Sequence, residues 1–336
     1  MSLSERPHSL PGASIRSFPE VRHLADFLAD GLRQLVVAHL GTGWSRGLSG
    51  RAVGGDTTFA IDEMAEAWME ERLAQVALPI AFYSEDRGLV GRPGAEWTFI
   101  VDPIDGTRPA AAGLEAACVS IAVARGTEAL VMADVCYAVV REIKEGGVFT
   151  AVRGGGVESK DGAGRTRPIR RSVNTDLSRL FWTIGFRGRP ARELVSVLGE
   201  LIDESSVDGG VFDLGSATYG MTRLLTGQLD AYVDVGPRMI EVVPAVEGRF
   251  REVGKGSILN NAPYDVAGAA LILEEGGCPV TDAAGRSLDD RPLLGADKAY
   301  QMSVIASCNR EIHEALLKVV ARGIDRLTAL VSREIS

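Results

Sequence analysis

The sequence predicts an α/β (α+β) fold divided into two domains, and three observations support this prediction. The chain has 336 residues, a length at which one hydrophobic core usually gives way to two. Short β-like runs and helical apolar patterns follow one another along the chain. A stretch rich in Gly, Arg, Lys and Asp over residues 154–171 is typical of a hairpin and a linker. We therefore expect a flexible tail over 1–18, an N-terminal α+β domain over 19–171 and a C-terminal α/β domain over 172–336.

The first domain begins with two helical patterns. Apolar residues recur at steps of three and four from Val21 to Val36, which predicts a long helix ending near Gly41. A second helical face starts at Ile61, where the acidic Asp62 in the first turn complements the helix dipole. The β-like runs that follow, each bounded by Gly, Pro or charged residues, cover 81–83, 97–101, 119–124, 131–140 and 147–152.

The second domain is expected to alternate strands and helices, as α/β proteins do. The predicted strands are 181–185, 210–213, 229–233 and 304–306. The predicted helices are 191–200, 216–225, 265–275 and 310–330. Gly276 and Gly277 end the third of these helices.

Charge and composition exclude several classes of protein. The net charge of −9 opposes binding to nucleic acid, because that binding depends on Lys and Arg neutralising phosphates, whereas acidic groups suit metal cations. No apolar run reaches the 18 residues of a membrane span, and the N-terminus lacks the apolar core of a secretory signal. The cysteines are widely separated and form no C-x-x-C pair, so reduced, buried thiols are expected. We expect a cytoplasmic protein.

The most informative segment is the string D-P-I-D-G-T that follows the apolar run from Trp97. Asp102 and Asp105 lie three residues apart with a proline between them, so both carboxylates could face one point and share divalent cations such as Mg²⁺. Gly106 lets the backbone approach a ligand, and Thr107 begins a predicted helical turn whose free amides would face a phosphate. A plain polar turn with a helix cap explains the D-P pair alone but not the whole string.

Three further acidic positions could complete a metal site. Glu85 follows a short apolar run and would lie at a strand end. Asp56 follows two glycines in a loop that leads into a helix. Asp265 starts a predicted helix. Each has a simpler reading, as a polar strand end, a loop acid or a helix cap.

Taken together and in this order, these segments resemble the inositol monophosphatase superfamily, whose members are Mg²⁺-dependent, commonly lithium-sensitive phosphatases. The matching segments, from about residue 21 to 310, are Gly55-Asp56, Glu85-Asp86, Asp102 to Thr107, Gly215-Ser216-Ala217, Thr226 to Tyr232, Tyr264 to Ala267, Glu275-Gly276-Gly277 and Val280 to Asp282. The resemblance implies a layered α-β-α-β-α sandwich of the sugar phosphatase type and a homodimer. It does not locate the dimer surface.

The resemblance also implies roles for individual residues. Two or three Mg²⁺ ions, with Mn²⁺ as a possible substitute, would be held by Glu85, Asp102, the carbonyl of Ile104, Asp105 and Asp265. Asp56 would orient the attacking water or help hold the weakest metal, and Thr107, with Glu85 or Asp56, would align that water for in-line attack on phosphorus. Phosphate and substrate contacts would come from Gly106, Thr107, Ser216 and Asp234.

Departures from the family pattern concern the substrate side. Arg108 and Pro109 stand where inositol-type members usually have Asn-Phe, and Tyr264 is the aromatic residue before the last Asp. The acid that matches a substrate contact, Asp234, lies 31 residues before Asp265 instead of a few. The intervening insertion, 238–261, is charged and could be a lid, a charged binding loop or a solvated surface segment.

The implied function is hydrolysis of a small sugar or polyol phosphate of the inositol monophosphate type. Two other substrates stay open within the same chemistry, fructose 1,6-bisphosphate and 3′-phosphoadenosine 5′-phosphate. An alternative of a different class is a non-catalytic, metal-binding regulatory protein with the same fold.

Overall fold

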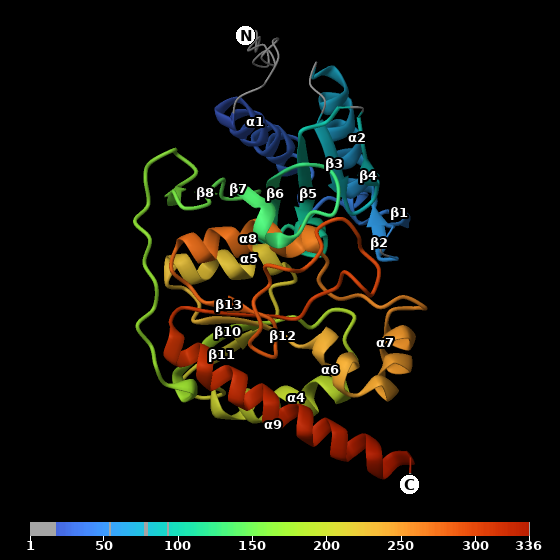
Figure 1. Cartoon of the computed structure of the whole chain (residues 1–336), viewed down its shortest axis with the longest axis vertical. Coiled ribbons are helices and arrows are strands. Elements are labelled where there is room, and N and C mark those ends of the chain that lie inside the picture. The colour runs from blue at the N-terminus through green and yellow to red at the C-terminus, as the bar shows by residue number, and fades with distance from the viewer. Residues whose placement is uncertain (1–17, 54, 77–79, 93, 336) are drawn as a thin grey trace.

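Two β-sheets alternate with three layers of helices in the computed structural model, which describes residues 18–53, 55–76, 80–92 and 94–335 (Figure 1). The order from one side to the other is helix, sheet, helix, sheet, helix, which confirms the layered architecture expected from the sequence. The predicted tail lies outside the described residues except for Phe18, which begins helix α1 (Phe18–Val37).

The first sheet has seven strands. In spatial order they are β4 (Gly88–Val90), β3 (Ile80–Ser84), β5 (Trp97–Asp105), β6 (Cys118–Arg125), β7 (Val135–Glu142), β8 (Val148–Val152) and β9 (Gly156–Lys160). Neighbours are antiparallel except for the parallel pair β3 and β5. Every residue of β5 is buried, because helices cover both faces of the sheet, and this explains its continuous apolar run.

Helices α1 and α2 (Ala60–Gln75) form the outer layer on this sheet (Figure 1). The apolar stripe read from the sequence of α1 is the buried one: Val21, Leu24, Leu28, Leu32 and Val36 are fully shielded from solvent. They pack against β6 and β7, while α2 packs against β5. Both helices therefore fix the strand that carries the D-P-I-D-G-T string.

Helices α5 (Ala217–Thr222) and α8 (Pro263–Glu275) make the middle layer, between the two sheets. Because sheets lie on both sides of it, α8 is buried on nearly all of its surface. A methyl group added at Gly268 would come within 2.8 Å of the Ser120 hydroxyl, which shows how closely α8 approaches β6. This contact places the start of α8 next to the end of β5.

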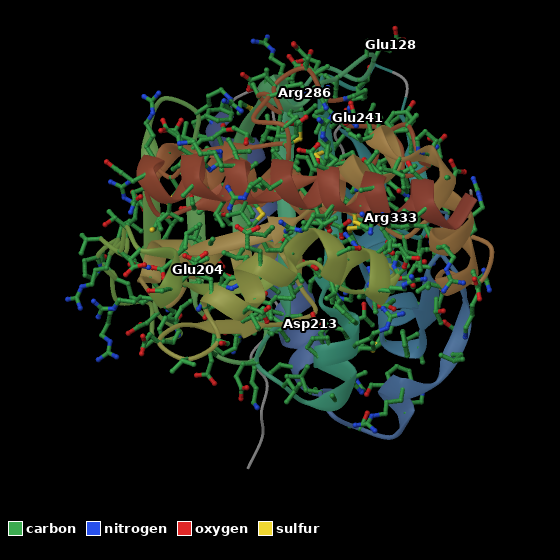
Figure 2. All side chains as sticks on the ribbon, turned by 90° about the horizontal axis from the view of Figure 1, so that it is seen from below. Glu128, Glu204, Asp213, Glu241, Arg286 and Arg333 are labelled. Atoms are coloured by element: carbon green, nitrogen blue, oxygen red, sulfur yellow. The ribbon has the colours of Figure 1, made fainter. Side chains whose placement is uncertain are left out.

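The second sheet has five strands, and a layer of helices covers its outer face. Its strands in spatial order are β11 (Gly210–Phe212), β10 (Phe181–Ile184), β12 (Ala231–Asp234), β14 (Val304–Ser307) and β13 (Val280–Thr281). Figure 2 looks onto the outer layer, in which the long α9 (Arg310–Ile335) crosses α4 (Ala191–Glu204). Among the described residues, each helix is too short or too polar to span a lipid bilayer.

The insertion over 238–261 forms helical structure. It contains α6 (Gly236–Val242), a 3₁₀ turn at Pro244–Val246 and α7 (Glu247–Val253). Phe250 of α7 is fully buried among the side chains of α4, α9 and the second sheet, so the insertion contributes to the core. Figure 2 shows Glu241 of α6 close to Arg286, with which it forms a 3.1 Å ion pair.

The predicted strand over 131–140 is wrong at its beginning. Residues Met132–Asp134 form a 3₁₀ turn, and β7 starts at Val135. The Asp134 carboxylate accepts a hydrogen bond from the Val131 amide at 2.8 Å, which stabilises the turn. The sequence also gave no indication of the hairpin of β1 (Leu48–Arg51) and β2 (Thr57–Phe59), which is short and exposed on β1.

The domain boundary near Ser172 stays a prediction. The chain passes from the first sheet to the second between β9 and β10, which agrees in position with the predicted linker. However, α8 belongs to the second half of the sequence and packs on the first sheet. The two halves of the sequence therefore share one hydrophobic core in the middle layer.

The crossing of α4 and α9 makes a testable prediction. A Cβ at Gly323 would lie 2.1 Å from the backbone oxygen of Val197, so Gly323→Ala must push the helices apart. We expect a loss of about 1–3 kcal/mol in the free energy of unfolding, measured by urea denaturation. The matched control is Gly199→Ala in α4, where the added methyl meets only Val195 at 3.6 Å. This variant should gain about 0.5–1 kcal/mol from helix propensity. Equal stability of the two variants would contradict the close packing.

Candidate active site

A β-bulge at the end of β5 aims two carboxylates at one point. Asp102 pairs with Ser120 of β6 and Asp105 pairs with Cys118, so β5 holds one extra residue between these pairs. In a regular strand, residues three apart face opposite sides of the sheet, and the bulge cancels this alternation. Pro103 lies inside the bulge, where its missing N–H costs no ladder hydrogen bond. The prediction that Asp102 and Asp105 face the same point is therefore explained by a bulge.

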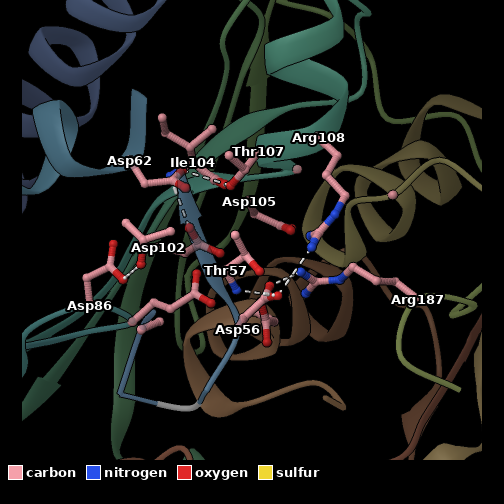
Figure 3. Close-up of a pocket in the computed structure, with 16 residues that line it drawn as sticks. Asp56, Thr57, Asp62, Asp86, Asp102, Ile104, Asp105, Thr107, Arg108 and Arg187 are labelled. Carbon is pink, nitrogen blue, oxygen red and sulfur yellow. Dashed lines mark hydrogen bonds and ion pairs between the residues drawn. The ribbon is translucent and has the colours of Figure 1, made fainter. Parts of the chain in front are cut away.

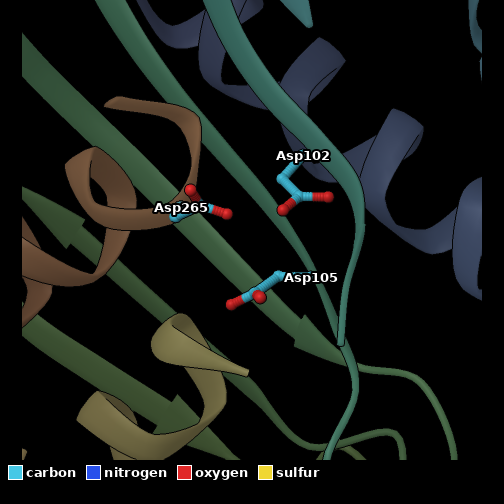
Figure 4. A group of neighbouring side chains, drawn as sticks. All are labelled: Asp102, Asp105 and Asp265. Carbon is cyan, nitrogen blue, oxygen red and sulfur yellow. The ribbon is translucent and has the colours of Figure 1, made fainter. Parts of the chain in front are cut away.

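Asp265 joins these two carboxylates from the middle layer (Figure 4). Carboxylate oxygens of Asp102, Asp105 and Asp265 lie within 4.8 Å of one another. Asp265 also caps α8, because one of its oxygens accepts a hydrogen bond from the Ala262 amide at 2.7 Å. The two readings of Asp265 from the sequence, helix cap and metal ligand, are thus compatible, since the other oxygen remains for a ligand.

The three aspartates line a pocket that also contains Glu85, the residue after β3 (Figure 3). Its walls carry seven carboxylates and two arginines; the acidic residues are Asp56, Asp62, Glu85, Asp86, Asp102, Asp105 and Asp265. The carbonyl residue Ile104 and the turn residues Gly106 and Thr107 complete the lining expected from the sequence. Glu85 is in the same pocket but outside the tight group of three aspartates.

Crowding and burial oppose ionisation of these acids. Burial, followed by repulsion from Asp105, raises the pKa of Asp265 to about 7. Burial and the charge of Asp265 raise the pKa of Glu85 well above its ordinary value, and burial with the charge of Asp105 does the same to Asp102. Such acids are neutralised either by protons or by a bound cation, because like charges held together in a low-dielectric site repel one another.

The donor set fits a hard divalent cation. All of the candidate ligands are oxygens, and Mg²⁺ prefers carboxylates and carbonyls to nitrogen or sulfur. A bound divalent ion would also offset the repulsion that raises these pKa values. Asp102, Asp105 and Asp265 therefore form a group that could hold a metal ion.

The Thr107 hydroxyl meets an acid that the sequence pattern did not connect with it, Asp62. It lies 2.8 Å from Oδ1 of Asp62 and 3.2 Å from the carbonyl oxygen of Ile104, and it has only one proton to donate. Neither Glu85 nor Asp56 accepts it. Asp62 is held in place because its other oxygen accepts the Phe59 amide at 2.8 Å, at the start of α2. Burial raises the pKa of Asp62 to about 7, so this carboxylate can gain or lose a proton near neutral pH.

Asp56, the acid expected to orient water or hold the weakest metal, is engaged by arginines (Figure 3). Its Oδ1 accepts from Arg108 at 3.2 Å, and its Oδ2 is paired with Arg187. Burial opposes its ionisation, but Arg187 and then Arg108 outweigh burial and lower the pKa of Asp56.

Two residues predicted to contact phosphate or substrate, Ser216 and Gly106, also support the turn, and their contact with substrate stays a prediction. The Ser216 hydroxyl donates to Oδ2 of Asp105 at 2.8 Å, and the Thr218 amide donates to the same oxygen at 2.6 Å. Gly106 has a φ of 94°, and a Cβ there would lie 2.4 Å from the Ala116 carbonyl oxygen, so no larger residue fits. Ser216 thus orients a candidate metal ligand.

Asp234 is not among the residues that line the pocket, and its predicted contact with substrate stays a prediction. Asp234 is completely buried, paired with the buried Arg189, and it accepts the Gly236 amide at 3.0 Å. A contact between Asp234 and a substrate would have to compete with this buried ion pair.

The sequence pattern did not indicate that Asp62 and Arg187 line the pocket. Asp62 stood out only as a helix-dipole acid, and nothing in its spacing connected it with Thr107. Arg187 lies just after a predicted strand, in the stretch Gly185 to Gly188. A cation between glycines at a strand end is a signal that could have found it.

The raised acid pKa values make a testable prediction about metal and pH. Folding raises the pKa of Asp265 from 3.8 to about 7. The free energy of unfolding of the protein therefore falls as the pH rises between those two values, because the folded state must then hold an unfavourable charge. Metal binding removes that penalty, and at low pH protons compete with the metal. The rise in Tm on adding Mg²⁺ should therefore be larger at pH 8 than at pH 5.5, measured by thermal unfolding with EDTA as reference.

Asp265→Asn provides the control for this measurement, because it removes both the titrating group and one candidate ligand. In this variant the difference between the two pH values should shrink. A Tm increment independent of pH in the unaltered chain would contradict the assignment of these acids to a cation site.

Comparisons with known proteins bear on this pocket. A model of the Inositol monophosphatase family matches residues 28–324. An inositol-1-monophosphatase of Mesorhizobium japonicum is 26% identical over 274 residues, which cover 80% of this chain and 85% of that protein. The Nus factor SuhB of Xylella fastidiosa is 26% identical over 264 residues, covering 77% and 80%. The fructose-1,6-bisphosphatase of Pyrococcus furiosus is 23% identical over 266 residues, covering 79% and 84%.

The fold is also that of solved structures. The Thermotoga maritima IMPase superposes with a TM-score of 0.63 at 20% identity, covering 91% of this chain and 98% of its own. The matched residues of the family model include both sheets and every candidate ligand of the pocket. Because the model spans most of the sequence, this chain belongs to the inositol monophosphatase family.

Proposed function

We propose that the protein is a Mg²⁺-dependent phosphomonoesterase that hydrolyses a small sugar or polyol phosphate of the inositol monophosphate type. The observation that carries the proposal is the convergence of Asp102, Asp105 and Asp265 beside the Thr107–Asp62 hydrogen bond. One side of the pocket offers oxygen ligands for cations, and the other offers a hydroxyl with a proton acceptor. Hydrolysis of a phosphate ester needs both.

The cation ligands proposed here are Glu85, Asp102, Asp105, Asp265 and the carbonyl of Ile104. Bound Mg²⁺ would make water more acidic and offset charge on the phosphate and on the leaving oxygen. Mn²⁺ is a possible substitute because it accepts the same oxygen donors. The Ser216 hydroxyl and the Thr218 amide keep Asp105 pointing into the pocket.

The proton acceptor is proposed to be the pair Thr107 and Asp62. Water attacks phosphorus in line with the ester oxygen, and the P–O ester bond breaks as the new P–O bond forms. The water proton passes to Oγ of Thr107, whose own proton passes to Asp62. The ester oxygen leaves with the bonding electrons and takes a proton from a solvent water to become an alcohol. The backbone at Gly106 and Thr107 is proposed to bind the phosphate oxygens.

The residues of the pocket indicate the type of reaction more clearly than they indicate the substrate. Inositol monophosphate leads because an inositol-1-monophosphatase is among the relatives, and fructose 1,6-bisphosphate follows because a fructose-1,6-bisphosphatase is another. 3′-Phosphoadenosine 5′-phosphate is third. Arg108, at the pocket rim, replaces the residue that would have favoured inositol.

We also propose a homodimer that binds neither nucleic acid nor membrane. The edge strand β11 supports self-association, since Val211 is 38% exposed and Phe212 is 40% exposed. The Phe212 ring stacks on Phe181 at 6.4 Å, which makes an apolar patch at the open edge of the sheet. The net charge of −9 opposes contact with nucleic acid.

A second candidate function is regulatory. A relative with 26% identity is named a Nus factor, and a protein with this role could bind metal without turnover. The intact set of carboxylates in the pocket favours the enzyme, because burying them without a catalytic use costs stability.

The proposed function predicts Mg²⁺-dependent phosphate release. Metal-stripped protein, with and without Mg²⁺, is tested on inositol 1-phosphate, fructose 1,6-bisphosphate, glycerol 2-phosphate and 3′-phosphoadenosine 5′-phosphate. We expect one preferred substrate and no release without metal. Asp105→Asn, which keeps the shape of the side chain, should abolish release. Folded, Mg²⁺-binding protein that is inactive on all four substrates would favour the regulatory role.

A separate prediction concerns the proton acceptor. Thr107→Ala and Asp62→Asn should each lower kcat by about 10²–10⁴-fold, with a smaller change in KM, because each breaks the same proton path. The double variant should be little worse than either single variant. Thr226→Ala, which removes a hydroxyl bonded to the Arg223 carbonyl outside the pocket, serves as the control. Additive losses in the double variant would show that the two residues do not act together.

A further inference from the structure

We propose that Arg108 and Arg187 occupy the Asp56 carboxylate in place of a divalent cation, so that the cations bound by this chain are confined to the pocket around Asp102, Asp105 and Asp265. The inference rests on the proposed metal site and deepens it. It concerns the mouth of the pocket, where the sequence departs from the family pattern at Arg108.

Both oxygens of Asp56 already have cationic partners. Nη2 of Arg108 lies 3.2 Å from Oδ1, which also accepts the Thr57 amide at 2.7 Å, and Nη1 of Arg187 is paired with Oδ2. The Asp56 side chain is only 11% exposed, so the pairs are shielded from water on the side of the carboxylate. The two guanidinium charges outweigh the single negative charge of the carboxylate, so the group as a whole does not attract a divalent ion.

Arg187 is held in place by the chain around it. The next arginine, Arg189, donates to the backbone oxygen of Arg187 and to that of Leu259, the latter at 2.9 Å. Arg189 is itself fixed by its buried ion pair with Asp234. Asp234 thus acquires a role in positioning Arg187.

Arg108 is anchored by contacts of its own. It follows Thr107 in α3 (Thr107–Ala112), and its guanidinium carbon lies 5.6 Å from the centre of the Phe59 ring. A cation over an aromatic face is favourable by itself and limits the movement of the side chain. The two arginines therefore reach Asp56 from separate elements, α3 and the segment after β10.

An arginine guanidinium and a divalent metal ion compete for the Asp56 carboxylate. A guanidinium stays charged at every physiological pH and binds a carboxylate through oriented N–H donors. A divalent ion at Asp56 would have to displace these donors and then lie beside two positive groups. Arg187 also lines the pocket that contains Glu85 and Asp265, so it supplies positive charge beside these candidate metal ligands.

Counting bound Mn²⁺ tests this inference without turnover. Metal-stripped protein is titrated with Mn²⁺, and bound ions are counted by electron paramagnetic resonance. The unaltered chain and Asp56→Asn should bind the same number, about two per chain. Arg108→Ala combined with Arg187→Ala frees Asp56 and should bind one more ion. Combining Arg165→Ala with Arg310→Ala removes two exposed arginines that pair with Asp161 and Glu314 instead, and this control should match the unaltered chain.

Loss of an ion in Asp56→Asn would overturn the inference, and so would the absence of a gain in the Arg108/Arg187 variant. If that double variant does not fold, the Asp56→Asn count decides alone. Asp105→Asn separates this inference from the proposed function. It should lose Mn²⁺ if the aspartate site is correct, whatever the result at Asp56.

Discussion

The repulsion among buried carboxylates is the constraint on which the rest of this structure depends. Asp102, Asp105 and Asp265 have oxygens within 4.8 Å of one another, and the pKa of Asp265 is raised to about 7 as a result of burial and this repulsion. Side chains with such an arrangement separate unless rigid elements hold them. The close approach of α8 to β6 and the bulge in β5 provide that rigidity, at a cost in stability that a cation can offset.

The layered fold explains how segments far apart in sequence meet at this point. The end of β5 and the end of β3 are parallel neighbours, so Asp102 and Glu85 emerge at the same edge of the first sheet. The start of α8 lies against that edge because the middle layer has sheets on both sides and cannot shift. Atoms that must act together on one phosphate are thus placed by three elements that pack on one another.

The rim of the pocket is held by ion pairs between arginines and acids. The positive charges of Arg108 and Arg187 offset part of the negative charge at the mouth of the pocket. Arg189, which is paired with the buried Asp234, holds the backbone of Arg187 and of Leu259 in the insertion. The carboxylates follow the order of the family pattern, whereas Arg108 departs from it. Substrate choice and metal number are therefore expected to depend on the rim, and the reaction type on the aspartates.

The sequence by itself determined the order of most helices and strands, the all-buried strand β5 and most of the acidic residues that line the pocket, because apolar periodicity and the D-P-I-D-G-T string are local signals. Only the tertiary structure decided which side chains are partners. Thr107 meets Asp62 across 45 residues, Asp56 meets Arg187 across 131, and Asp234 is paired with Arg189 in the interior. Such pairings depend on how the layers pack, and no local pattern encodes the distance between residues on different layers.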